Sequence, residues 1–359
     1  LSGAIERGTE TPASLLALGR IRLRQGVRGE ARRFFENGLQ MGLRPDMSVS
    51  SWVMAELHYE RGSLLRGNWR ASKGVGQVRA EAFARASCNE ARYSGAAGTG
   101  FASVERLIAW NYLCPAEMRT IFEVGFQERD QSAADLTLMM ASYRAAIESY
   151  APHHGANVDF LVTLADHGRW ADVLRGARRF TRVTGGHPDG LLLAGMALHR
   201  LDRSHEAEPL LREALARMEE GRRDRLLDVG VLLGVDERAE YRRLPAAQRR
   251  VWEKDYWATK DRIPATAVNE RWVEHVTRAA YADLALGGVL GDAGEVWIRF
   301  GGPETIHIVD GGSGRLTEFW DYGSGPDITF IRWVSSDRMD LTPEGRAYVD
   351  DLGRIFSPE

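Results

Sequence analysis

Apolar residues recur at helical spacing through most of the first 245 residues, and small residues recur there on a longer period. Residues 12–45 and 188–218, each numbered from its first proline, carry small or apolar side chains at positions 8, 20, 24 and 27. These positions hold Gly19, Ala31, Phe35 and Gly38 in the first stretch, and Gly195, Ala207, Leu211 and Ala214 in the second. Small side chains let two antiparallel helices cross closely, so each stretch is predicted to form a helix pair.

Weaker copies of the same unit lie one period away from each of these stretches. The matching positions are Val53, Leu65 and Ser72 after the first stretch, and Leu161, Val173 and Phe180 before the second. Residues 103–127 and 132–152 keep the helical spacing but lose the repeat. We therefore predict an N-terminal α-solenoid over residues 1–244, whose stacked helix pairs present a concave surface. A plain helical bundle without a ligand is the alternative.

The pattern changes from residue 245 onward. Residues 245–260 and 267–287 are amphipathic at helical spacing, and Thr266 is placed to cap the second of these helices. Alternating stretches separated by glycine-rich turns predict strands at 294–300, 305–310, 316–322 and 328–334. Pro343 marks the start of a last helix. Residues 245–359 are thus predicted to be a second domain, a small antiparallel sheet packed on two helices, which makes the whole chain α+β.

The 34-residue spacing of the first domain resembles the tetratricopeptide repeat. Three motifs of the second domain, in this order, resemble the GWxTD family over residues 245–335. They are "YWATKDRIPATAVNERW" (256–272), "GVLGDAGEVWIRFGGPE" (288–304) and "EFWDY" (318–322). Gly288 and Asp292 of the namesake motif remain, whereas Val289 and Gly291 stand where tryptophan and threonine would be.

Members of the GWxTD family are bacterial, mostly exported domains that are often found with tetratricopeptide-type repeats, so the resemblance implies a bacterial and exported protein. It implies a fold and a cellular setting more than a reaction. We accordingly expect a periplasmic or envelope-associated protein, whose signal peptide or lipid anchor preceded Leu1. In that setting Cys88 and Cys114 are able to form a disulfide, and two buried thiols are the alternative.

Composition narrows the possible partners. The 359 residues are 44% hydrophobic and 27% charged, with a formal net charge of −3. This balance argues against general binding of nucleic acid, which needs a basic face. No apolar run is long enough to span a membrane, so no transmembrane segment is predicted.

Motifs for catalysis, cofactor binding or metal binding are missing from the sequence. Gly301 and Gly302 follow a predicted strand, but no lysine follows them as a phosphate-binding loop requires. The nine histidines are scattered, with no metal-binding helix motif among them. No serine or cysteine lies in a nucleophile motif. We therefore predict no catalytic residue, no cofactor and no metal, while Asp292 with Glu318 stays open as a carboxylate pair for glycan hydrolysis.

Aromatic residues are concentrated in the second domain and suit either a core or a stacking platform. Alternation places Trp297 and Arg299 on the face of the predicted strand opposite Val296 and Ile298. The predicted interaction surface consists of Trp257, Trp297, Arg299, Trp320 and Tyr322.

Together these features predict a non-enzymatic scaffold protein of the bacterial cell envelope. Its expected partner is a larger membrane-bound complex, of which an electron-transport or photosynthetic assembly is an example, and the chain would be an accessory subunit. The alternative is a hydrolase of envelope glycan or peptide that uses carboxylates of the second domain.

Overall fold

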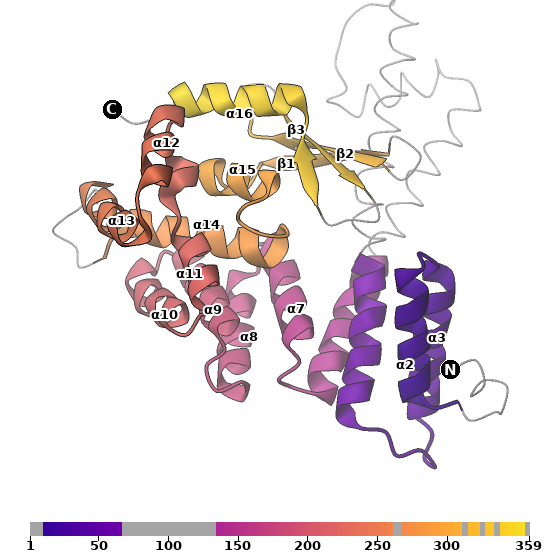
Figure 1. Cartoon of the computed structure of the whole chain (residues 1–359). Helices are drawn as coiled ribbons and strands as arrows, with labels where there is room; N and C mark the ends of the chain where they lie inside the picture. Colours follow the sequence, from indigo (N-terminus) through magenta and orange to yellow (C-terminus); the bar gives the residue numbers. More distant parts are fainter. Residues whose placement is uncertain are drawn as a thin grey trace, which may run out of the picture.

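The computed structural model describes residues 10–66, 134–260, 268–310, 315–323, 327–333 and 338–355. Over these ranges the chain is mostly helical, with one small antiparallel sheet towards the C-terminus, so the predicted α+β composition is confirmed. Figure 1 shows the N-terminal helices side by side in the lower part of the view. The sheet and the C-terminal helices lie above the pairs nearer the middle of the chain. None of the helices in the described ranges combines the length and hydropathy that a membrane span requires.

The first predicted helix pair is present. It consists of α2 (Pro12–Arg24) and α3 (Arg28–Gly42), which pack against each other. Thr11 caps α2, because its hydroxyl accepts the backbone N–H of Ser14 while the Ser14 hydroxyl accepts the N–H of Thr11. Gly19 lies where the helices cross, and a Cβ added there would overlap the ring of Phe35.

The second helix pair is formed by two helices that are far apart in the sequence. The helix over residues 51–66 packs against the helix over residues 134–149, with Leu65 in contact with Met139 and Tyr143. Gly62 gives Tyr143 room at this crossing. Ser72, predicted for this repeat, lies outside the described residues. The two helices of this pair are therefore separated in the sequence by residues 67–133.

Two further pairs follow and form the largest core. They are α7 (His154–Asp166) with α8 (Trp170–Val183), and α9 (Pro188–Arg200) with α10 (Ser204–Ala216). Gly176 approaches Leu161 in the third pair, and Gly195 approaches Leu211 in the fourth. Gly195 was predicted at its crossing, whereas in the third pair the predicted position holds Leu161 and the small residue opposite is Gly176. Helix α9 is buried almost all round because it packs against α8, α10 and α14.

Short helices then lead into the C-terminal part: α11 (Glu220–Leu227), a 3₁₀ turn (Val229–Leu232), α12 (Val235–Arg243) and α13 (Ala246–Lys260). Helix α14 (Glu270–Ala285) begins at Asn269, whose side chain accepts the N–H of Trp272 at 3.0 Å. Thr266, predicted as this cap, lies outside the described residues. The predicted helices at 245–260 and 267–287 are confirmed as α13 and α14.

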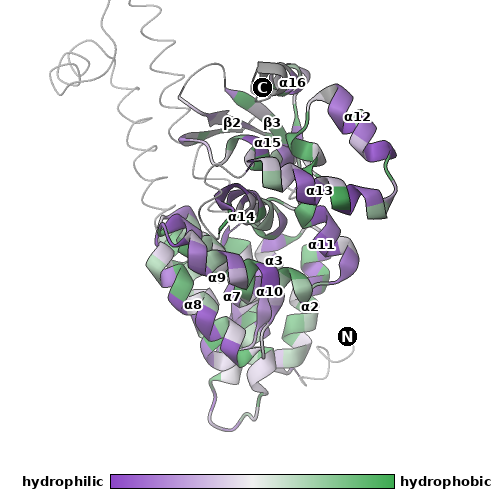
Figure 2. Ribbon diagram, turned by 90° about the vertical axis from the view of Figure 1, so that its left-hand side faces the viewer, coloured by the Kyte–Doolittle hydropathy of each residue, from purple (hydrophilic) through white to green (hydrophobic). Residues whose placement is uncertain are grey.

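Helix α14 joins the two predicted domains through one hydrophobic core. It packs against α7, α9, α10 and α11 on one side and against α15 on the other. Figure 2 shows α14 between the helical array and the layer formed by α15 and the sheet. A single apolar cluster runs from Val158 to Ile298. This cluster crosses the boundary predicted between residues 244 and 245, while the sheet has a separate cluster with α15 and α16.

Residues 294–300 were predicted to form a strand, and this prediction is wrong. They belong to helix α15 (Asp292–Phe300). A short apolar run of this kind fits either period, so alternation alone cannot assign it. The helix also places Glu295 one turn before Arg299, at 3.4 Å. Gly301 ends it with a positive φ of 83°.

The sheet has the order β1-β2-β3-β4 and is antiparallel throughout. Its strands are β1 (Thr305–Asp310), β2 (Arg315–Asp321), β3 (Ile328–Trp333) and β4 (Met339–Leu341). The last three predicted strands are confirmed, whereas β4 was too short to predict. Trp320 and Phe330 face α15 and α16 (Pro343–Ile355), where they pack with Val296 and Val349.

Candidate functional site

The predicted aromatic interaction surface is buried inside the molecule. Trp320 is only 1% exposed, and Trp257 is also buried. Trp297 stacks on Tyr281 of α14, with ring centroids 4.1 Å apart. Trp257 and Trp320 therefore belong to the core and Trp297 packs half-buried against it, so these three side chains do not form an exposed surface. The prediction of such a surface assumed a strand at 294–300, whereas the helix turns Trp297 towards α14.

The other two predicted surface residues are engaged by neighbouring elements. The side chain of Arg299 is 8% exposed and lies among charged groups around Glu295, which also pairs with Arg346 at 2.8 Å. The hydroxyl of Tyr322 donates to the carbonyl of Gly301 at 3.0 Å. Arg299 thus pairs within α15, whereas Tyr322 links β2 to the turn that follows α15.

Asp292 and Glu318 serve separate ion pairs. The Asp292 carboxylate accepts the backbone N–H of Leu341 at 2.7 Å and pairs with Arg346. Glu318 is buried beside Arg332, with a nitrogen–oxygen distance of 2.8 Å. Each carboxylate thus has a structural role in the sheet or its junction with α15. Cys88 and Cys114, the predicted disulfide, lie outside the described residues.

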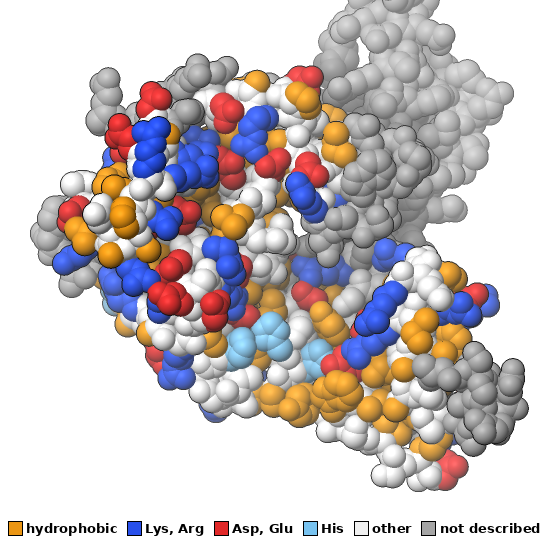
Figure 3. Space-filling model, in the orientation of Figure 1, with side chains coloured by type: hydrophobic (Ala, Val, Ile, Leu, Met, Phe, Trp, Pro, Cys, Tyr) orange, Lys and Arg blue, Asp and Glu red, His pale blue; other side chains and the backbone are white. Residues whose placement is uncertain are grey.

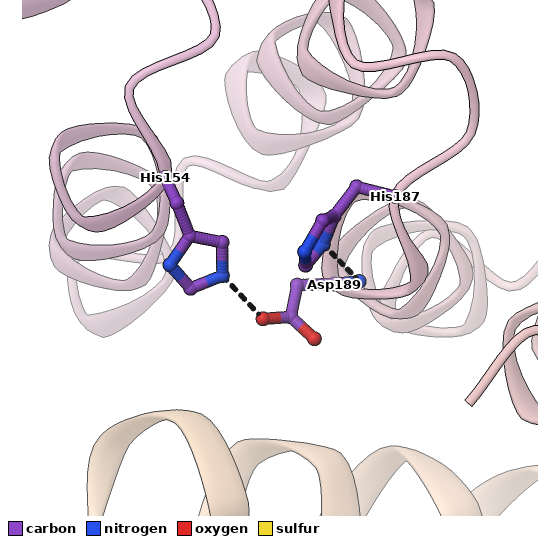
Figure 4. Close-up of side chains that lie close together, drawn as sticks. All are labelled: His154, His187 and Asp189. Atoms are coloured by element: carbon purple, nitrogen blue, oxygen red, sulfur yellow. Dashed lines mark hydrogen bonds and ion pairs between the residues drawn. The ribbon is translucent and has the colours of Figure 1, made fainter. Parts of the chain in front are cut away.

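Sequence reasoning missed a cluster of His154, His187 and Asp189, which comes together between the third and fourth helix pairs. His154 is the first residue of α7, His187 is the N-cap of α9, and Asp189 lies in the first turn of α9. Figure 4 shows the Asp189 carboxylate below the gap between the two imidazole rings. One ligand atom from each residue lies within 4.8 Å of the other two.

Asp189 is the centre of this cluster. His154 Nε2 lies 2.7 Å from its Oδ2, and Arg222 Nη1 lies 2.7 Å from its Oδ1. Arg222 also pairs with Asp283 of α14 at 2.7 Å. The Asp189 side chain is 3% exposed, whereas that of His154 is 52% exposed. The cluster therefore has a buried carboxylate and an open side at His154.

The environment keeps Asp189 ionised and His187 neutral. Burial alone would raise the pKa of Asp189, but the hydrogen bond from His154 and the charge of Arg222 outweigh it and lower that pKa. Burial lowers the pKa of His187. Its Nδ1 accepts the backbone N–H of Asp189 at 3.2 Å and so caps α9.

A second histidine contact lies beside the first. His153 caps α7, since its Nδ1 accepts the N–H of Ala156 at 3.0 Å. Its Nε2 is 3.6 Å from Glu56, which shares Arg20 with Glu60. Figure 3 shows histidines in a hollow on this face, with acidic and basic side chains around it.

The repeat period indicates the region of the cluster but does not identify its three residues. His153 and His187 are 34 residues apart, and each is the N-cap of the first helix of a pair. The ligands His154 and His187 are 33 residues apart, so the period does not pair them, and a search for short metal motifs does not detect them either. The imidazoles of His154 and His187 and the carboxylate of Asp189 are chemically suited to a transition-metal ion.

Compared with known proteins, the chain matches no family model, no curated protein and no solved structure. The resemblances to the tetratricopeptide repeat and to the GWxTD family therefore stay predictions.

Proposed function

We propose that this chain is a non-enzymatic interaction protein that docks on a larger assembly. The observation that carries the proposal is the stacking of helix pairs, with polar contacts linking the first helix of each pair to that of the next. Arrays of this kind work by presenting an extended face to a partner. Both carboxylates of the rival hydrolase hypothesis are engaged in structural ion pairs.

The polar contacts define what we call the inner face. Arg20 of α2 pairs with Glu56 of the next pair, and Arg66 of that pair bonds Asp159 of α7. His154 of α7 then contacts Asp189 of α9. We define the inner face by these six residues together with Glu60.

Some of the array is already covered by the chain itself. Helix α14 packs on α7, α9 and α10, so the third and fourth pairs are partly closed by the C-terminal part. The first two pairs carry charged side chains that stay accessible, such as Arg20, whose side chain is 36% exposed. We propose that a partner contacts the inner face mainly through these first two pairs.

The proposed setting is the bacterial envelope, with the chain as an accessory subunit of a membrane-bound complex. This element of the proposal rests on the resemblance of residues 245–335 to the GWxTD family.

Cross-linking in the source organism tests the proposed face. A photoreactive amino acid at Arg20 should cross-link a defined protein, whereas the same amino acid at Arg175, an exposed residue of α8, should not. Circular dichroism should show both variants folded. Equal cross-linking from both positions, or none from Arg20, would contradict the proposal.

A further inference from the structure

We propose that His154, His187 and Asp189 form a binding site for a divalent transition-metal ion such as zinc. This inference does not depend on the interaction function, because the three residues and their supporting contacts belong to the isolated chain. It also departs from the sequence prediction that the protein binds no metal.

The ligand set and its spacing suit such an ion. Zinc binds imidazole nitrogen and carboxylate oxygen at about 2.0–2.2 Å, so ligands at tetrahedral corners lie roughly 3.4 Å apart. His154 Nε2 and Asp189 Oδ2 are now 2.7 Å apart, and no pair of the three ligand atoms exceeds 4.8 Å. The three ligand atoms are therefore close enough to one another to converge on a single ion.

The supporting contacts are arranged as metal sites require. Arg222 holds Asp189 Oδ1 and is itself held by Asp283, which fixes the carboxylate and leaves Oδ2 directed at His154. Contacts of this kind orient ligands and contribute strongly to the affinity of a metal site. The exposed side of His154 gives an ion a path from solvent and leaves a coordination position open to water.

The charge of the surroundings also permits a cation. With neutral imidazoles, Asp189, Asp283 and Arg222 sum to a formal charge of −1, as do Glu56, Glu60 and Arg20, which lie next to the adjacent His153. The two helix N-termini at the site contribute only about half a positive charge each. The net negative charge therefore outweighs them.

Metal binding requires two local changes in the histidines. The proton on His154 Nε2, which lies between that nitrogen and Asp189, moves to Nδ1 or leaves to solvent when Nε2 takes the ion. His187 turns its ring towards the ion and binds it through Nε2, or through Nδ1 once that nitrogen gives up the 3.2 Å bond to the N–H of Asp189. Imidazole donors select zinc, nickel, copper or cobalt over magnesium and calcium.

Isothermal titration of the untagged full chain with zinc chloride tests the site. Cys88→Ser and Cys114→Ser form the background, so that neither thiol binds the metal. We expect one zinc ion per chain and no heat with magnesium chloride. Cobalt should give the visible absorption of a four-coordinate ion.

Two substitutions remove ligands while keeping the local structure. His187→Ser keeps an N-cap oxygen for α9, and His154→Gln keeps an N–H donor for Asp189. Each should weaken zinc binding at least about tenfold, which corresponds to ~1.4 kcal/mol. His205→Gln, on the exposed side of α10, should leave it unchanged.

Without zinc, all three variants and the background protein should unfold at similar temperatures. Weaker zinc binding then reflects the loss of a ligating side chain and not the loss of the fold. The proposal is overturned if the background protein shows no saturable zinc binding. It is also overturned if zinc binding survives both ligand substitutions, or if His205→Gln weakens it equally.

Discussion

His275 is a titratable residue in the middle of the shared core. It lies on α14, is 4% exposed, and its ring contacts Trp257 at a centroid distance of 5.0 Å. Burial lowers its pKa to about 4. The folded protein therefore keeps this imidazole neutral over a pH range in which the unfolded chain protonates it near pH 6.5.

This difference predicts a loss of stability at mildly acidic pH. The folded state binds fewer protons, so lowering the pH from 7 to 5 favours the unfolded chain by about 2 kcal/mol through His275. The contribution is complete below pH 4, where both states are protonated. Urea unfolding at pH 7, 6 and 5 should show the free energy of unfolding falling as the pH falls, and His275→Leu should make this slope shallower. An unchanged slope in that variant, with His205→Gln as the exposed control, would refute this role.

At the scale of elements, the helix crossings depend on missing side chains. Gly19 of α2 lies against the ring of Phe35, whereas a Cβ added at Gly29 of α3 would have no neighbour within 4 Å. Gly19→Ala should thus lower the free energy of unfolding by about 1–3 kcal/mol through overpacking. Gly29→Ala should be neutral or stabilise by up to about 1 kcal/mol. Chemical denaturation measures both, and equal effects would show that the crossing does not govern the packing.

Elements with long or repeated patterns were predictable from the sequence. Positions 8 and 24 of the repeat located Gly19 against Phe35 and Gly195 against Leu211. Strand alternation with glycine turns located β1, β2 and β3. The pattern failed at residues 294–300, where Val296 and Ile298 fit a strand and a helix equally well and tertiary contacts decide.

Contacts between distant residues were not predictable. No local signal indicates that 51–66 pairs with 134–149, because the repeat is interrupted between them. The cluster of His154, His187 and Asp189 depends on two helix N-termini meeting across consecutive pairs. Local patterns specify the elements, whereas these sites depend on how the elements stack.

At the scale of the whole molecule, α14 joins the helices α7 to α10 with α15 into a single structural unit, whereas the sheet packs in a separate apolar cluster. Val276 of α14 is fully buried in the cluster that includes α9. Val276→Ala should destabilise both helices by about 2 kcal/mol, since it removes two methyl groups and leaves a cavity. Hydrogen exchange should show a similar loss of protection in α9 and α14. A loss confined to α14 would mean that the two helices unfold separately.

Helix α14 covers parts of the third and fourth helix pairs but not the first two. We propose that the partner binds at these first two pairs. An interaction protein of this kind should be isolated with its partner when the complex is kept intact. Charged contacts on the inner face also predict that high salt weakens the association.

The most direct test is the composition of the complex after gentle solubilisation of membranes from the source organism. We predict that the chain co-purifies with defined proteins at fixed stoichiometry and elutes at the size of that assembly. Elution of the chain alone as a monomer, with no partner retained at low salt, would contradict the proposed function.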